Sequence, residues 1–163
     1  MRIKVAGIVN DSIVDGPGLR LTVFAQGCTH NCKGCHNKET HDPQGGYYID
    51  TEEIIEMARK NPLLSGISLS GGEPFMQAKA MTELAKSARG LGLNIIIYTG
   101  YLWEELMKNE EFKGLAAEAD YVIDGPFKLS LRTLNMPFVG SSNQRVIDVK
   151  KSMEAGEAVL YEF

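Results

Sequence analysis

Residues 66–98 read GISLSGGEPFMQAKAMTELAKSARGLGLNIIIY, and this stretch decides the fold. Its first residues form a short apolar run closed by a glycine pair, which is typical of a strand. Apolar residues then recur at helical spacing over 78–89, and three consecutive isoleucines within 94–98 predict a strand buried on both faces. Strand, helix and strand in this order predict a βαβ unit with parallel strands and a right-handed crossover.

The same alternation continues on both sides of this unit. Upstream, residues 21–24 predict a strand, and residues 51–60 predict a helix that Asp50 and Glu53 can cap. Downstream, the pattern predicts a helical region over 102–119 broken near Gly114, a strand over 121–123, and weaker strands at 145–149 and 159–161. A closed eight-stranded barrel typically needs ~250 residues. We therefore expect one α/β domain, 1–163, built as an incomplete parallel (β/α) barrel of about four to six strands.

The composition excludes several classes of protein. With 44% apolar residues, 23% charged residues and a net charge of -4, the chain has the balance of a globular protein and gives no indication of nucleic-acid binding. No stretch approaches the ~18 apolar residues of a membrane span, and residues 1–6 lack the apolar core of a signal peptide. We expect a cytoplasmic protein that binds neither nucleic acid nor membrane.

All three cysteines of the chain lie close together, at Cys28, Cys32 and Cys35. An odd number of cysteines in a cytoplasmic protein favours metal or catalytic thiols over a disulfide framework. Three thiolates can converge on one metal centre and leave one coordination position unfilled. In a 4Fe-4S cluster, one iron would then lack a cysteine and could bind a small molecule through nitrogen and oxygen.

Three other interpretations of the cysteines remain open at this point. Their spacing also fits the buried stripe of a helix, although the glycine and asparagine between them are poor helix formers. The last two cysteines have the C-x-x-C spacing of a redox dithiol, without its usual setting. A structural zinc site is the strongest rival, because His30, His36 or His41 would complete a tetrahedral Cys3His set.

The unusual loops of the chain are expected at one edge of the sheet. In parallel α/β folds the reactive groups lie on loops at the carboxyl ends of strands. The cysteine loop, Gly71–Pro74, Thr99–Gly100 and Asp124 all follow predicted strands. Without a Cβ, the glycine pair lets main-chain groups approach a ligand amine closely. A shared edge favours the cluster over a structural zinc ion, which needs no neighbouring pocket.

The cysteine loop together with Gly71-Gly72-Glu73-Pro74 resembles the radical S-adenosylmethionine superfamily. Within it, three further segments are similar to the activating proteins of anaerobic ribonucleoside-triphosphate reductases, namely Asp15–Arg20, Tyr98–Tyr101 and Gly140–Gln144. The match covers most of residues 12–147. Many members carry an aromatic residue immediately before the third cysteine, whereas this chain has Gly34, which is familiar in the subgroup.

This resemblance implies a fold, two cofactors and a set of contacts. The fold is the incomplete barrel of the radical S-adenosylmethionine type, with a 4Fe-4S cluster on the three cysteines and S-adenosylmethionine on the iron that lacks one. No side chain beyond the cluster and this cosubstrate is expected to be catalytic. The expected contacts with S-adenosylmethionine are Gly34, Cys35, His36, Gly71, Gly72, Glu73 and Pro74, with Thr99, Asp124, Ser142 and Asn143 as further pocket candidates.

The resemblance also implies partners. Reductive cleavage of S-adenosylmethionine would give a 5′-deoxyadenosyl radical, which would take a hydrogen atom from a glycine of the reductase. The implied partners are that reductase and a one-electron donor such as flavodoxin or ferredoxin; an activating enzyme for pyruvate formate-lyase is the alternative. An incomplete barrel leaves one side open for the partner's loop, with residues 128–145 facing the partner or covering the site.

Overall fold

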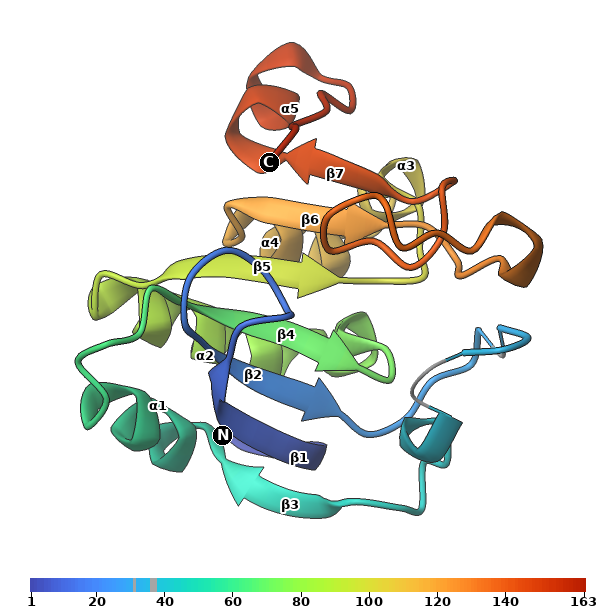
Figure 1. The fold of residues 1–163 in the computed structure, drawn as a ribbon. Helices are drawn as coiled ribbons and strands as arrows, with labels where there is room; N and C mark the ends of the chain where they lie inside the picture. Colours follow the sequence, from blue (N-terminus) through green and yellow to red (C-terminus); the bar gives the residue numbers. More distant parts are fainter. Residues whose placement is uncertain (31, 36–37) are drawn as a thin grey trace.

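The computed structural model describes residues 1–30, 32–35 and 38–163. Within these ranges the chain forms one seven-stranded sheet (Figure 1). Its strands are β1 (Arg2–Ser12), β2 (Arg20–Ala25), β3 (Tyr47–Asp50), β4 (Gly66–Gly71), β5 (Asn94–Tyr98), β6 (Tyr121–Asp124) and β7 (Arg145–Asp148). They lie in the order β3-β1-β2-β4-β5-β6-β7.

The sheet is parallel in its centre and antiparallel at its edges. Strands β2, β4, β5 and β6 run parallel, as the βαβ pattern predicts. Strands β1, β3 and β7 are antiparallel to their neighbours, and β3 and β7 form two open edges. The incomplete barrel is thus confirmed: its four parallel strands lie within the expected number, and the antiparallel strands extend the sheet to seven.

Helices follow the strands at the predicted places, with one correction. They are α1 (Thr51–Arg59), α2 (Ala78–Gly90), α3 (Trp103–Leu106), α4 (Glu110–Ala117) and α5 (Val149–Ala155), with short 3-10 turns at Lys38–Thr40, Pro74–Gln77 and Leu129–Leu131. The predicted break near Gly114 is wrong, since Gly114 lies inside α4. The chain breaks before Asn109 instead, because the side chain of Asn109 accepts from the first backbone N–H groups of α4.

The last predicted strand is also corrected. Residues 159–161 form no strand; Leu160 makes an isolated bridge to Ile147, and the N–H of Tyr161 donates to the carbonyl of Val146 at 2.8 Å. The tail thus touches the β7 edge at a few residues and adds no strand to the sheet. Within the described ranges, every helix is too short or too polar to span a bilayer.

The two faces of the sheet are covered differently. Helices α1, α2 and α4 pack on one face over the main apolar core, behind the sheet in Figure 1. Loops cover the other face, where Ile96 and Ile123 pack against Val139 of the segment after β6. The segment between β1 and β2 crosses the same face. The loop-covered face therefore has room for a cavity at the carboxyl ends of the parallel strands.

A buried arginine fixes the loop between β1 and β2. Arg20 is fully buried; its Nε donates to the Ser68 hydroxyl at 2.7 Å and its Nη1 donates to the carbonyl of Pro17 at 3.0 Å. Burial lowers the pKa of Arg20 to about 10. Gly16 packs against the Arg20 side chain and against Ile96, so a Cβ there would clash with both. This turn is thereby held on the sheet, which places Asp15 at the edge of the cavity.

Candidate functional site

A cavity of about 680 Å³ opens at the carboxyl ends of β2, β4, β5 and β6. Its size suits a small molecule. The lining includes several residues that the sequence singled out: Cys28, Cys32, Cys35, Gly71, Gly72 and Thr99. The structure thus brings the cysteine loop and the glycine pair to one cavity, as their positions after parallel strands predict. His36, another candidate, lies outside the described residues.

The glycine pair packs directly on the chain that leads to the first cysteine. The N–H of Gly72 donates to the carbonyl of Ala25, and the N–H of Glu73 donates to the carbonyl of Gly27, both at 2.8 Å. A Cβ on Gly72 would clash with the Gly27 carbonyl and stand 2.9 Å from that of Thr40. Glycine is therefore required here for close backbone packing, in addition to any access that it gives to a ligand.

One acceptor of the glycine pair remains available to a ligand. Gly72 lines the cavity, and no described backbone or side-chain group donates to its carbonyl oxygen. A cationic amine needs such an acceptor. The Gly72 carbonyl therefore fits the amino group of an amino-acid ligand.

The cysteines supply the donor set of an iron-sulfur cluster. Thiolates are the usual ligands of such clusters, and all three line the cavity. Among the described residues, no group of three or more His, Cys, Asp or Glu is placed to hold a metal ion. A 4Fe-4S cluster attaches each cysteine to a different iron atom, so its ligands need not converge on one ion. The three thiols and the adjoining carbonyl fit a cluster with one iron left for a ligand.

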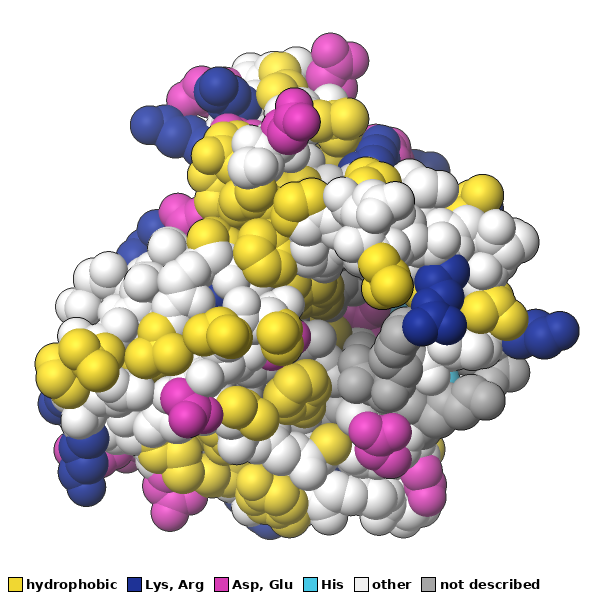
Figure 2. Space-filling view, viewed as in Figure 1, with side chains coloured by type: hydrophobic (Ala, Val, Ile, Leu, Met, Phe, Trp, Pro, Cys, Tyr) yellow, Lys and Arg dark blue, Asp and Glu magenta, His cyan; other side chains and the backbone are white. Residues whose placement is uncertain are grey.

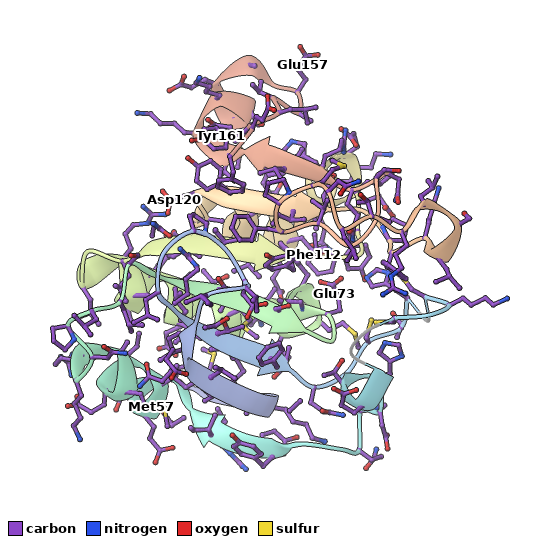
Figure 3. All side chains as sticks on the ribbon, viewed as in Figure 1. Met57, Glu73, Phe112, Asp120, Glu157 and Tyr161 are labelled. Atoms are coloured by element: carbon purple, nitrogen blue, oxygen red, sulfur yellow. The ribbon has the colours of Figure 1, made fainter. Side chains whose placement is uncertain are left out.

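Glu73, which was expected to contact S-adenosylmethionine, does not line the cavity. Its carboxylate is fully buried, and Figure 3 marks it at the carboxyl end of β4. Oε1 lies 2.6 Å from His30 Nε2 and accepts from the N–H of Gly100 at 2.9 Å, while Oε2 accepts from the N–H of Phe75 at 3.1 Å. The Thr99 hydroxyl lies 2.8 and 2.9 Å from the two oxygens. The Glu73 carboxylate instead links its own loop after β4 to the loops after β2 and β5.

His30, between the first two cysteines, is held by this carboxylate. The hydrogen bond to Glu73 raises the pKa of His30, against the opposing effect of burial. The His30 and Tyr101 rings pack in a T-shaped arrangement with their centroids 4.6 Å apart. The His30 imidazole thus lines the cavity while its Nε2 is bound to the Glu73 carboxylate.

Other candidates lie outside this lining. Gly34 has a φ of +74° and faces Leu129, whose side chain a Cβ would meet at 3.0 Å. Pro74 is buried at the start of a 3-10 turn. The Asp124 carboxylate is buried, accepting from Arg145 Nε at 3.0 Å and from the N–H of Trp103 at 2.7 Å. Asp124 therefore has protein partners in place of a ligand.

The segment after β6 does contribute to the cavity, through neighbours of the expected pair. Ser142 is exposed and the Asn143 side chain donates to the carbonyl of Pro126 at 2.8 Å, whereas Gly140 and Gln144 line the cavity. The segment 140–144 thus forms part of the cavity wall as expected, but through Gly140 and Gln144 and not through Ser142 and Asn143.

Several cavity residues had no signal in the sequence. The mouth is apolar: Val14 is 72% exposed and Leu134 is 88% exposed, on opposite segments, and Figure 2 shows apolar side chains beside the hollow. Single apolar residues in loops follow no periodicity, so only the fold brings them together. Asp15 also lines the cavity, but it belongs to a segment that the sequence did single out; its carboxylate accepts from the hydroxyls of Ser12 at 2.5 Å and Thr22 at 3.1 Å.

Comparisons with known proteins agree with this site. The family described as a 4Fe-4S single cluster domain matches residues 14–147. The anaerobic ribonucleoside-triphosphate reductase-activating protein of Enterobacteria phage T4 is 31% identical over 139 residues, which are 82% of this chain and 86% of that protein. The protein of the same name from Escherichia coli K12 is 32% identical over 143 residues, which are 82% of this chain and 91% of that protein.

Two further matches are weaker, one in coverage and one in sequence identity. The pyruvate formate-lyase-activating enzyme of Clostridium pasteurianum is 32% identical over 117 residues, but these are 66% of this chain and 49% of that enzyme. The crystal structure of QueE from Escherichia coli superposes with a TM-score of 0.49 at 15% identity, over 61% of this chain and 53% of that chain. The chain belongs to the 4Fe-4S single cluster domain family and, within it, to the radical S-adenosylmethionine activating enzymes typified by the anaerobic ribonucleoside-triphosphate reductase-activating proteins.

Proposed function

We propose that this protein activates an anaerobic ribonucleoside-triphosphate reductase by generating a glycyl radical on it. Cys28, Cys32 and Cys35 would hold the 4Fe-4S cluster, and S-adenosylmethionine would occupy the same cavity. Together these groups would supply reductive cleavage of S-adenosylmethionine and abstraction of a hydrogen atom from a glycine of the partner. One observation carries the proposal: the three cysteines line a single cavity together with Gly72, whose carbonyl accepts from none of the described groups.

The residues of the chain itself would bind, orient and shield. The Gly72 carbonyl would accept from the amino group of the cosubstrate, while Val14, Asp15 and residues of the segment 127–144 wall the cavity and would exclude water. The apolar mouth at Val14 and Leu134 suits a protein segment more than a charged metabolite. Because the sheet is open at β3 and β7, no further strand closes the barrel within the described ranges.

The reductase is favoured as the partner because the match covers more of its activating proteins than of the pyruvate formate-lyase-activating enzyme. The two reductase-activating relatives share nearly their whole length with this chain, whereas the match spans only about half of the pyruvate formate-lyase-activating enzyme. We also propose that residues 1–163 form a single radical S-adenosylmethionine domain and that a flavodoxin or ferredoxin supplies the electron. A cytoplasmic location stays a prediction.

The test combines the reconstituted, reduced protein with S-adenosylmethionine and a candidate partner under anaerobic conditions. Electron paramagnetic resonance should show a glycyl radical with the reductase, and the release of methionine should accompany it. Pyruvate formate-lyase serves as the second arm. A radical on pyruvate formate-lyase and none on the reductase would overturn the assignment of the partner. A protein that binds one zinc ion and no iron would overturn the reaction as well.

A further inference from the structure

Both oxygens of the buried Glu73 carboxylate are occupied by donors from the protein and are not available to a ligand. It is 0% exposed, and its two oxygens face four groups: the His30 ring, the Thr99 hydroxyl and the N–H groups of Gly100 and Phe75. A buried carboxylate is tolerated only when such donors satisfy it. Among the described residues, His30 is the one potentially cationic group in contact with it.

These partners come from separate loops. His30 lies in the cysteine loop after β2, Glu73 itself follows the glycine pair at the end of β4, and Thr99 and Gly100 follow β5. The backbone of Glu73 adds a further link, because its N–H donates to the Gly27 carbonyl at 2.8 Å. One residue therefore joins the loops after three neighbouring parallel strands, and all three loops carry residues that line the cavity.

His30 is also fixed by shape. A Cβ on Gly100 would stand 2.6 Å from Cδ2 of the His30 ring, so the ring lies directly on the Gly100 backbone. The Tyr101 ring packs against the His30 ring in a T-shaped arrangement. The ring is enclosed by Gly100, Tyr101 and Glu73, and these contacts hold residues 28–30 against the end of β5.

We propose that Glu73 is a positioning residue: through His30 it fixes the cysteine loop against the ends of β4 and β5, and so sets where the cluster stands relative to the Gly72 carbonyl. This rests on the proposed function for the identity of the cluster and its ligand. The ligand's amino group meets the backbone of Gly72 and not the carboxylate of Glu73. The effect of Glu73 on the bound ligand is therefore transmitted entirely through the loop.

The test uses the full-length protein with its cluster and needs no reductase. Glu73→Gln removes the charge and turns one acceptor into a donor, and Glu73→Asp keeps the charge but shortens its reach to His30. Glu39→Gln is the matched control, because it removes an exposed carboxylate beside the same loop. The readouts are iron content, hydrogen exchange of the amides of residues 28–30, and the change that S-adenosylmethionine causes in the paramagnetic resonance spectrum of the reduced cluster.

We expect both Glu73 variants to retain iron, to exchange the amides of residues 28–30 faster, and to need about tenfold more S-adenosylmethionine for the same spectral change. Glu39→Gln should match the wild type in all three. In a His30→Asn background, Glu73→Gln should add little further loss, since both changes break the same link. A Glu73→Asp variant that equals the wild type, or losses that add fully in the double variant, would overturn the proposal.

Two further results keep the proposal separate from the function on which it rests. If Glu73→Gln does not fold, Thr99→Val and Thr99→Ser replace it: Val should weaken the spectral response and Ser should restore it. If the wild type responds to S-adenosylmethionine but makes no radical on any reductase, the assigned partner fails and the role of Glu73 stands. If the wild type makes the radical and Glu73→Gln responds equally well, the role of Glu73 fails alone.

Discussion

The carbonyl oxygen of Gly27 lies where a side chain on Gly72 would have to stand. It accepts from the N–H of Glu73 at 2.8 Å, and any Cβ at position 72 would clash with it. The residue before the first cysteine and the second residue of the glycine pair thus pack backbone against backbone. This contact joins the two loops that the chemistry requires to be close, without a side chain from either.

Gly72→Ala should therefore destabilise the protein. The added methyl group must push the Gly27 carbonyl aside, and overpacking of this kind costs about 1–3 kcal/mol. Gly114→Ala is the matched control, because Gly114 lies inside α4 with open space around its Cα, where alanine should stabilise by roughly 0.5–1 kcal/mol. Urea denaturation of both variants, followed by circular dichroism, measures the two changes. Equal stability of Gly72→Ala and the wild type would contradict the contact.

Arg20→Met should destabilise the fold by about 3 kcal/mol, because the buried guanidinium donates to the Ser68 hydroxyl and to the carbonyls of Pro17 and Ile67. These acceptors would lose the buried donors that Arg20 supplies. Arg59→Met on the exposed face of α1 removes only an ion pair with Glu56 and should change stability little. The free energy of unfolding in urea gives both values. If the two variants lose the same amount, Arg20 is not the anchor of the turn.

The sequence predicted the parts of the fold that have strong local signals. The βαβ unit over 66–98 combines a strand pattern, a helix period and a glycine pair, and each element appears within a residue or two. Strand β1 was missed. Its pairing with β2 shifts register twice, so its burial does not alternate in the regular way that sequence patterns reveal. The break of the third helix was misplaced because the cap formed by Asn109 outweighs the low helix propensity of Gly114.

The site, like the fold, has features that the sequence predicts and features that it does not. Its position followed from the rule that loops after parallel strands share an edge, which brought the cysteines and Gly71–Gly72 together. The direction of each side chain could not be predicted. Glu73 points into the protein because His30 and Thr99 offer it donors there, and Asp124 is taken by Arg145 from β7. Such partners are distant in sequence, and only the folded chain shows that they meet.

Replacing any one of Cys28, Cys32 and Cys35 by Ala should abolish stable binding of the cluster, because two thiolates cannot hold it. Iron and sulfide per chain should fall to background after anaerobic reconstitution. Thr29→Ala, in the same loop and exposed, should bind iron like the wild type. Removal of iron from the wild type by a chelator should leave the far-ultraviolet circular dichroism unchanged, since the core between sheet and helices contains no cysteine. Full iron content in a single-cysteine variant would contradict the assigned ligands.

The C-terminal tail should hold the segment that walls the cavity. Phe163 contacts Phe138 edge to face with the ring centroids 5.3 Å apart, and Phe138 lines the cavity with a φ of +65°. Phe163→Ala should cost about 1–2 kcal/mol, since it removes the contacts of this half-buried ring with the rings of Phe138, Tyr121 and Tyr161. Hydrogen exchange of residues 130–142 should become faster while α1 stays unchanged. If exchange in this segment is unaffected, the tail does not restrain it.

The apolar mouth should decide whether the protein substrate can enter. Leu134 is 88% exposed at the rim of the cavity, and a glutamate there would place a charge where we propose that the partner's backbone passes. Burying that charge against a partner costs several kcal/mol unless it is paired, so Leu134→Glu should lower the yield of glycyl radical at least tenfold, on the order of 1.4 kcal/mol or more. Release of methionine in the absence of the partner should fall far less.

Leu63→Glu is the matched control: Leu63 is 75% exposed but precedes β4, at the opposite end of the strands, and should leave the radical yield unchanged. Equal losses of radical formation and of methionine release in Leu134→Glu would place this leucine in cosubstrate binding and not on the path of the partner.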